Sequence, residues 1–266
     1  MALTHAELMS AVEENPEGIF GLYARNMPGA IFERTSRIRR MNFGVPVAFL
    51  NGIAVAKFTT DDADDEIAKA IADMKATGLP WNWHIGPTTT PSDLGERLLQ
   101  HGLQFSYDMP LMTISTKDWS PSPLPENYKN IEVLDFDTFD RWLEVGEIAF
   151  KLPHVTFEIL RTATLNLGFG EDCPVRNFAG IVDGEIVCTS TIFYGRGIGG
   201  IYSVGTPADF RGKGFGGAVT EACIADAKQR GYETVFLQAS KMGFPVYRRL
   251  GFEEVAREYV YAPAEA

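Results

Sequence analysis

The sequence is poor in cysteine, with three among 266 residues: Cys173, Cys188 and Cys223. Their number is odd and their spacing matches no metal site, so we expect neither a disulfide framework nor a cysteine metal centre. Reduced thiols are typical of the cytosol, where structural disulfides are rare. We therefore predict a cytoplasmic protein that holds no metal.

Long apolar runs and an excess of positive charge are also missing. No stretch approaches the roughly 20 apolar residues of a membrane helix, and an acid, Glu7, already occurs where an export signal would be apolar. The formal net charge of −11 argues against general nucleic-acid binding. We expect no membrane and no nucleic-acid partner, whereas a cationic acceptor such as an amine is compatible with this acidity.

Glycine and positive charge are concentrated together at residues 204–218, between a predicted strand (200–204) and a predicted helix (214–230). The first turn of a helix has backbone N–H groups without partners, and its dipole favours an anion. Glycines there let a ligand approach the backbone. The residues that would form this pyrophosphate cradle are Arg211, Gly212, Lys213, Gly214, Phe215, Gly216 and Gly217. The alternative is a glycine-rich turn that only lets the helix pack closely on a sheet.

Two other phosphate-binding motifs fit this stretch less well. The letters Gly212-x-Gly214-x-x-Gly217 match a dinucleotide fingerprint, but that motif needs its first glycine directly after the strand and an acid at the end of the next strand. Here residues 207–211 intervene, and the next predicted strand (233–238) ends in glutamine. A triphosphate loop needs Ser or Thr after its lysine, and this lysine precedes glycine. Dinucleotide binding stays a weaker alternative that titration with NADH would test.

What remains, Arg211-x-x-Gly214-x-Gly216, resembles the acetyl-coenzyme A signature of the GNAT superfamily of N-acetyltransferases, written Gln/Arg-x-x-Gly-x-Gly/Ala. A second signature of that family has Asn or Ser seven residues before a Tyr, followed by Leu-Gly-Phe. Ser240, Tyr247 and the segment 250–252 occupy those places in this sequence. Two signatures in the family's order are far more specific than either alone.

The resemblance implies acetyl-coenzyme A as cosubstrate and assigns roles to the residues around it. The amides from Arg211 to Gly216 would take the pyrophosphate. The end of the preceding strand, which in the family splays from its neighbour, would hold the pantetheine through Val204, Gly205 and Thr206, with the Val204 N–H facing the thioester oxygen. Tyr247 would protonate the leaving sulfur, or else only pack against the coenzyme. Ser240 would orient coenzyme or a water, or else only cap a helix.

The general base is not identified. Glu147, His154 and Glu158 lie in or near the helix–loop–helix that usually lines the acceptor pocket of the family, where some members use a water chain instead. A single histidine is more often structural than catalytic. The aromatic residues Phe193, Tyr194 and Tyr202 could line the pocket, although core packing is the favoured interpretation.

Hydrophobic periodicity and turn residues predict a similar order of elements in both halves, each closing with helix, strand, helix and strand. In the first half we expect helices at 4–14, 61–77 and 91–101, and strands at 31–40, 45–57, 81–85 and 103–114. In the second half we expect helices at 136–150, 156–167, 214–230 and 244–250, and strands at 175–182, 185–194, 197–204, 233–238 and 253–260.

The halves also share local sequence. Residues 71–78 match residues 224–231 at five of eight places, and a repeat of this order argues for two copies of one fold. We predict an α/β (α+β) protein of two tandem GNAT-like domains, 1–118 and 127–266, each with a mixed central sheet flanked by helices. A proline-rich linker, 119–126, joins them.

The first copy is expected to be degenerate. In place of the cradle it has an acidic stretch, 59–66, without glycine or cation, and Leu98 stands where the second copy has Tyr247. The second copy would then transfer acetyl from acetyl-coenzyme A to the amine of a small-molecule or peptide acceptor by direct attack in a ternary complex. The alternative is a coenzyme A-binding sensor or structural protein without turnover. The acyl chain length and the oligomeric state, a homodimer included, stay open.

Overall fold

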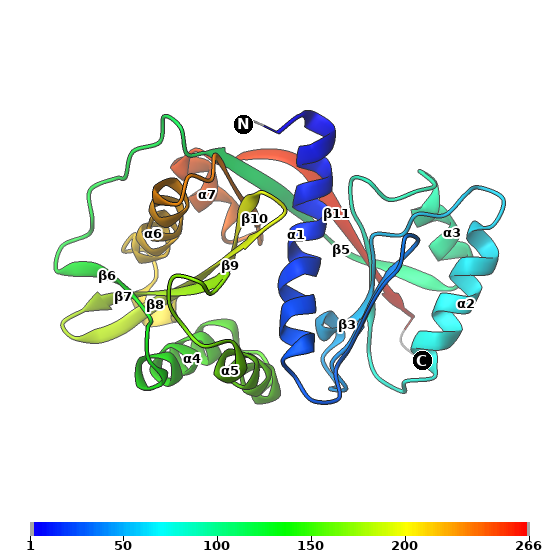
Figure 1. Cartoon of the computed structure of the whole chain (residues 1–266), viewed down its shortest axis with the longest axis horizontal. Helices are drawn as coiled ribbons and strands as arrows, with labels where there is room; N and C mark the ends of the chain where they lie inside the picture. Colours follow the sequence, from blue (N-terminus) through cyan, green and yellow to red (C-terminus); the bar gives the residue numbers. More distant parts are fainter. Residues whose placement is uncertain (1–2, 265–266) are drawn as a thin grey trace.

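The computed structural model describes residues 3–264, which form one eleven-stranded mixed sheet with helices on its faces (Figure 1). The helices are α1 (His5–Arg25), α2 (Ala63–Lys75), α3 (Leu94–Gln100), α4 (Phe136–Phe150), α5 (His154–Leu167), α6 (Phe215–Gln229) and α7 (Phe244–Leu250). The strands are β1 (Ile31–Arg34), β2 (Arg39–Asn42), β3 (Asn51–Ala54), β4 (Asn82–Ile85), β5 (Leu103–Ser115), β6 (Tyr128–Glu132), β7 (Val175–Val182), β8 (Glu185–Gly195), β9 (Ile198–Gly205), β10 (Thr234–Gln238) and β11 (Glu253–Pro263).

The strand order has an internal symmetry that the repeated sequence explains. The order is β1-β2-β3-β4-β11-β5-β10-β9-β8-β7-β6. The strands β3, β4 and β5 of the first half correspond to β9, β10 and β11 of the second, and each half contains one parallel pair, β3 with β4 and β9 with β10. If each strand of the central order β3-β4-β11-β5-β10-β9 is replaced by its counterpart, the same order results when read from the other end. The symmetry point therefore lies between β11 and β5.

The last strand of each half is exchanged into the sheet of the other. Strand β5 pairs with β10 of the second half, and β11 pairs with β4 of the first. The two strands also pair with each other, antiparallel, from Glu253 opposite Thr113 to Pro263 opposite Leu103. In Figure 1 they cross the centre of the molecule together. Each half therefore completes its sheet with a strand from the other, and the sheet continues across the expected domain boundary.

The second half follows the predicted order closely. Helices α6 and α7 lie on one side of its strands and α4 and α5 on the other (Figure 1). The hairpin between β7 and β8 turns at Asp183 and Gly184, whose φ values of 50° and 87° are those of the primed turn that Asp-Gly favours. The small residues of α6 let it lie on β8 and β9 over a core that includes Val219 and Val235. The three cysteines are buried and unpaired.

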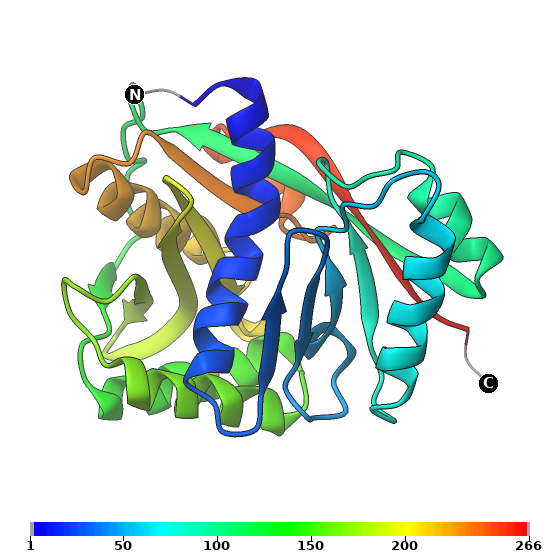
Figure 2. The same ribbon diagram turned by 45° about the vertical axis from the view of Figure 1, so that its right-hand side comes forward.

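Helix α1 is longer than the predicted 4–14. Its start is confirmed, because Thr4 and Glu7 form a capping box, but it continues through Pro16 to Arg25. Tertiary contacts explain the continuation: the buried Asn15 donates to the Gly195 carbonyl at 2.9 Å and accepts from the Tyr202 hydroxyl at 2.5 Å. Figure 2 shows α1 crossing the sheet between the two halves.

Two predicted strands of the first half are shorter or divided. The expected strand 31–40 is a hairpin of β1 and β2, which turns at residues 35–38 through bonds from Ile38 N and Arg37 N to Thr35 Oγ1. The expected strand 45–57 contains a short 3-10 helix (Ala48–Leu50) before β3. Both segments contain strands, but the turn at Thr35 and the 3-10 helix were not predicted.

The proline-rich segment 119–126 lies against α6. Ser122 donates to the Glu221 carboxylate through its N–H at 3.0 Å and its hydroxyl at 2.8 Å, and Lys228 Nζ donates to the Trp119 carbonyl at 2.6 Å. Strand β6 follows directly and was not predicted; it pairs with β7 at the sheet edge. No helix within residues 3–264 is both long and apolar enough to span a membrane.

A cluster of polar groups is enclosed where the halves meet. Glu258 of β11 accepts from Gln238 Nε2 at 2.9 Å and lies 3.2 Å from His84 Nδ1 of β4. Burial opposes the charge of His84, but the Glu258 carboxylate and then Glu17 raise its pKa overall. Glu17 of α1 is partly buried, and desolvation raises its pKa to about 7, opposed by His84 and Arg39 and assisted by Glu258 and Glu13.

This cluster predicts a pH dependence of stability. A carboxyl whose pKa is raised on folding contributes stability that is present below its unfolded pKa of 4.5 and is lost as the pH rises toward 7. Glu17→Gln should therefore shrink the excess of stability at pH 5.5 over pH 8 by about 2 kcal/mol, or roughly 4 °C in Tm. The measurement is thermal unfolding at both pH values, with Glu14→Gln on the same helix as control. An unchanged difference in the Glu17 variant would contradict the assignment.

Candidate active site

The two parallel strands of the second half separate at their ends. Strand β9 pairs with β10 at Gly199, Gly200 and Ile201 only, opposite Val235, Phe236 and Leu237. It then continues to Gly205 while β10 ends at Gln238. Two residues after the last pair, Ser203 has a φ of 52°, and the pairing of β9 with β8 shifts register there. This bulge turns β9 away from β10, so Val204, Gly205 and Thr206 lie beyond the last pair.

The glycine loop places helix amides directly after this open strand end. A 3-10 turn (Ala208–Phe210) leads to Gly212 and Gly214, whose φ values of 77° and 84° explain why glycine occupies both positions. Helix α6 begins at Phe215, and the first helical bond runs from Ala218 N to the Gly214 carbonyl at 3.0 Å. The N–H groups of Phe215, Gly216 and Gly217 come before this first bond and have no carbonyl acceptor within the helix.

The two cations of the loop have different surroundings. Arg211 donates to the Thr206 carbonyl at 2.9 Å and to the Ala149 carbonyl of α4 at 3.3 Å, so it ties the loop to the end of β9 and to α4. Lys213 Nζ lies 5.6 Å from the centre of the Phe210 ring. Both cationic side chains are exposed, so both can still approach an anion at the helix start.

Ser240 lies before the turn that leads into α7, and Tyr247 lies within α7. Tyr247 is buried, packs edge-on against Phe252, and its hydroxyl makes no hydrogen bond to any residue in the range 3–264. Burial, with a smaller effect of the Cys223 thiol, raises the pKa of Tyr247 to about 12. Ser240 is exposed, and its Oγ accepts from Gly243 N at 3.0 Å. This bond closes the turn before α7, whose N-cap is Gly243 and has no side-chain cap bond, so Ser240 is not the helix cap named as its alternative role. Its hydroxyl hydrogen stays available.

The three acid–base candidates come together at the junction of α4 and α5. His154 Nδ1 lies 3.0 Å from Glu147, and its Nε2 lies 3.4 Å from Glu158. The hydrogen bond and charge of Glu147 raise the pKa of this exposed histidine. Of the three aromatic residues, Phe193 packs in the core, Tyr194 donates to Asp226, and Tyr202 lines the cavity described below.

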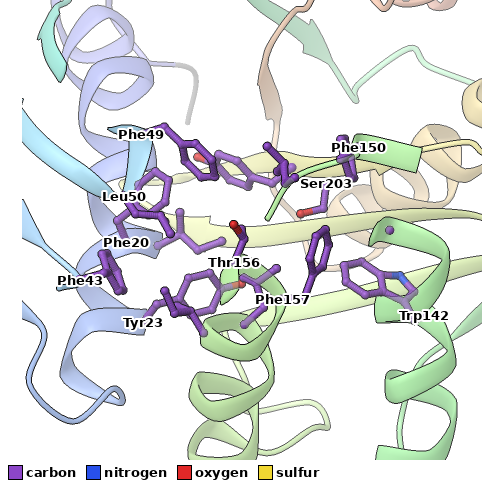
Figure 3. A pocket seen from close by; sticks show the side chains of 16 residues that line it. Phe20, Tyr23, Phe43, Phe49, Leu50, Trp142, Phe150, Thr156, Phe157 and Ser203 are labelled. Atoms are coloured by element: carbon purple, nitrogen blue, oxygen red, sulfur yellow. The ribbon is translucent and has the colours of Figure 1, made fainter. Parts of the chain in front are cut away.

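That cavity, of about 210 Å³, lies between the halves (Figure 3). Its walls come from α1, the segment 43–50, α4, α5 and β9, where Tyr202 and Ser203 follow the last β9–β10 pair. The contributions of Phe20, Phe43 and Phe49 cannot be predicted from the sequence, because their approach to α5 depends on how the halves pack. The cavity lining includes none of the three acid–base candidates.

The first half keeps the strand separation but fills it with its own chain. The pairing of β3 with β4 ends at Ile53 and Trp83, and Val55, two residues later, has a φ of 50°, as Ser203 does in the second half. Beyond this point Phe58 N donates to the Thr90 carbonyl at 3.0 Å, and Thr90 N donates to the Ala56 carbonyl at 3.0 Å. These bonds occupy backbone groups that correspond to the open end of β9.

The acidic stretch 59–66 is also occupied by internal contacts. Asp62 pairs with Arg37 at 2.8 Å, and Asp64 pairs with Arg97 at 2.5 Å. Leu98 is fully buried in the core under α2. Both observations agree with structural roles for the residues that replace the cradle and the tyrosine. Residues 3–264 contain no group of three or more His, Cys, Asp and Glu arranged for a metal ion.

Comparisons with known proteins agree with this geometry. Residues 142–252 match the model of the Acetyltransferase (GNAT) family. No curated protein matches the chain. Among solved structures, a GCN5-related N-acetyltransferase from Kribbella flavida is similar at 17% identity, with 96% of each chain covered and a TM-score of 0.73. One from Sphaerobacter thermophilus has 19% identity over 98% of this chain and 93% of that chain, with a TM-score of 0.66.

A tandem GNAT protein from the clavulanic acid biosynthesis pathway is 11% identical, covers 98% of this chain and 96% of its own, and has a TM-score of 0.64. Identities this low show the fold alone, and they show it over nearly the whole chain. The predicted α/β fold of GNAT type is thus confirmed. Taken with the family match, residues 142–252 are an acetyltransferase (GNAT) domain, and the protein is an enzyme of the transferase class.

Proposed function

We propose that the protein transfers an acetyl group from acetyl-coenzyme A to the amine of a small-molecule or peptide acceptor within one ternary complex. The observation that carries this proposal is the continuity of the open end of β9 with the free amides that start α6. Arg211 supports it by tying the two together. A glycine-rich turn that served only close packing would not need a neighbouring strand end that is open on its β10 side.

The residues present fit the coenzyme. The amides and cations of Arg211–Gly217 suit a pyrophosphate, because a helix start with left-handed glycines presents several N–H groups to one anion. The stretch Val204–Thr206 lies beyond the last pair with β10 and is held on its other side by β8, so its β10-facing side can pair with the amide groups of the pantetheine as a strand would. The coenzyme supplies the activated acetyl group as a thioester. The acyl chain that best suits the site is short, because Phe150 lies directly against Gly205.

The chemistry requires one bond to form and one to break. The amine nitrogen bonds to the acetyl carbon, the carbon–sulfur bond breaks, and one proton passes overall from nitrogen to sulfur. The Val204 N–H is our candidate for stabilising the carbonyl oxygen.

With its pKa raised to about 12, Tyr247 stays protonated at neutral pH. It first donates a hydrogen bond to the leaving sulfur, and the proton follows as negative charge develops there. Ser240 can orient coenzyme or a water with its free hydroxyl hydrogen.

A second candidate is a protein that binds coenzyme A without turnover. The observation that favours it is the position of Glu147, His154 and Glu158 outside the cavity lining. Release of free thiol from acetyl-coenzyme A on addition of amines separates the two functions, because a sensor would bind coenzyme A and release none.

The cradle predicts a sharp effect of Gly214→Val on coenzyme binding. The branched side chain would block the approach to the amides of α6, and losing two charge-assisted hydrogen bonds weakens binding by roughly 10²–10³-fold. Calorimetric titration with coenzyme A measures this. The matched control is Gly231→Val, since Gly231 also has a positive φ, of 79°, but lies after the far end of α6. Equal affinities in the two variants would remove the loop from the binding site.

Tyr247→Phe should separate catalysis from binding. The variant keeps the ring contact with Phe252 and loses only the hydroxyl, so coenzyme affinity should stay within about twofold. The single-turnover rate should fall by roughly 10²–10⁴, the usual effect of removing a positioned acid. Tyr232→Phe is the control for the same chemical change outside the site. A normal single-turnover rate in the Tyr247 variant would leave this tyrosine a packing residue.

A further inference from the structure

The cavity between the halves is apolar on almost every side. Aromatic and aliphatic side chains form its walls, and no charged side chain in the described part of the chain lines it. Phe20 and Phe49 are among the contributors from the first half, and Phe157 and Leu160 of α5 are among those from the second. Figure 3 shows these groups converging from both halves. A charged ligand placed there would lose its hydration without compensation.

The polar groups of the cavity are few, and one of them lacks a partner. The Thr156 hydroxyl is buried and makes no hydrogen bond to any described residue, although Thr156 itself is only 5% exposed. In Figure 3 the side-chain oxygens of Thr156 and Ser203 turn toward the space between the rings. The Tyr202 hydroxyl, in contrast, already donates to Asn15. A buried hydroxyl without a partner is costly to a protein, so it indicates a ligand group that would satisfy it.

The cavity adjoins the position proposed for the thioester. Tyr202 and Ser203 line it and immediately precede Val204, whose N–H we assign to the carbonyl oxygen. Phe150 lines it as well and contacts Gly205. A molecule in the cavity would therefore have one end beside the parted strands.

We propose that this cavity binds the acceptor, and that the acceptor is a primary amine with one compact, uncharged aromatic or hydrocarbon body, held by a hydrogen bond to Thr156. This inference rests on the proposed acetyl transfer. A volume of about 210 Å³ admits a benzene-sized ring with a short aliphatic chain, since engineered cavities of about 150 Å³ already bind benzene. Polyamines and aminoglycosides are disfavoured because the walls offer no carboxylate.

The same cavity accounts for the missing base. Apolar surroundings disfavour an ammonium ion and lower its pKa, so the amine enters and reacts in its neutral form. Its nitrogen bonds to the acetyl carbon as the carbon–sulfur bond breaks. The proton that nitrogen then sheds passes to water, and sulfur takes one from Tyr247, which water reprotonates. No carboxylate within the cavity is required for this balance.

The test compares three amines as acceptors, with saturating acetyl-coenzyme A and thiol release as readout. We expect kcat/KM for 2-phenylethylamine to exceed that for propylamine by roughly 10- to 100-fold, the effect of burying a phenyl ring. Spermidine should be poorer than propylamine. A higher kcat/KM for spermidine than for 2-phenylethylamine would overturn the inference and leave acetyl transfer standing.

Variants test whether the cavity is where the amine binds. Phe49→Ala should raise KM for 2-phenylethylamine about tenfold and leave coenzyme affinity unchanged. Thr156→Val, which keeps the shape and removes the hydroxyl, should raise KM by about five- to tenfold without lowering Tm, because it also removes an unpaired buried group. The control is Phe105→Ala, on the exposed part of β5 away from the cavity.

The outcomes distinguish the two proposals. Absence of coenzyme A binding by calorimetry would reject the proposed function itself. Coenzyme binding without turnover of 2-phenylethylamine would reject the acceptor class. Turnover of this amine with KM unaffected by both Phe49→Ala and Thr156→Val would show that it binds elsewhere, which also overturns the inference.

Discussion

The antiparallel pairing of β5 with β11 is the constraint on which the rest of the structure depends. These strands belong to different halves, yet each is also paired with a penultimate strand of the other half. Because of this exchange, neither sheet is complete without the partner half, and the angle between the halves is fixed by backbone hydrogen bonds. The cavity is built on that angle, since its walls come from both halves. A flexible linker between independent domains could not hold such walls in place.

The two halves share one architecture but differ where their parallel strands separate. Both have a left-handed residue two positions beyond the last parallel pair, Val55 in one and Ser203 in the other. In the first half Thr90 pairs with the strand beyond this point, and ion pairs of Asp62 and Asp64 stabilise the helix start. In the second half glycines leave the corresponding backbone open. The difference lies in a few loop residues, since the sheet is the same.

Features with local causes could be predicted from the sequence, and features that depend on contacts between halves could not. The Asp183-Gly184 hairpin, the cradle glycines and the boundaries of α4 and α7 follow from turn chemistry and periodicity near each residue. The continuation of α1 past Pro16 depends on Asn15 meeting Gly195 and Tyr202, which are about 180 residues away. The strand exchange and the contributions of Phe20 and Phe49 to the cavity were missed for the same reason.

Under the proposed function, the first half has a physical role of its own. It lacks the cradle, but under that function its aromatic side chains make the surroundings of the amine apolar. In water an aliphatic amine at neutral pH is almost entirely protonated, and its nitrogen has no free electron pair. An enzyme can remove that proton with a positioned base, or it can bind the amine where the charged form is unstable. The exposed cluster around His154 suits the first solution poorly, because solvent screens it. The apolar walls of the cavity suit the second, and they form only because the first half is packed against the second.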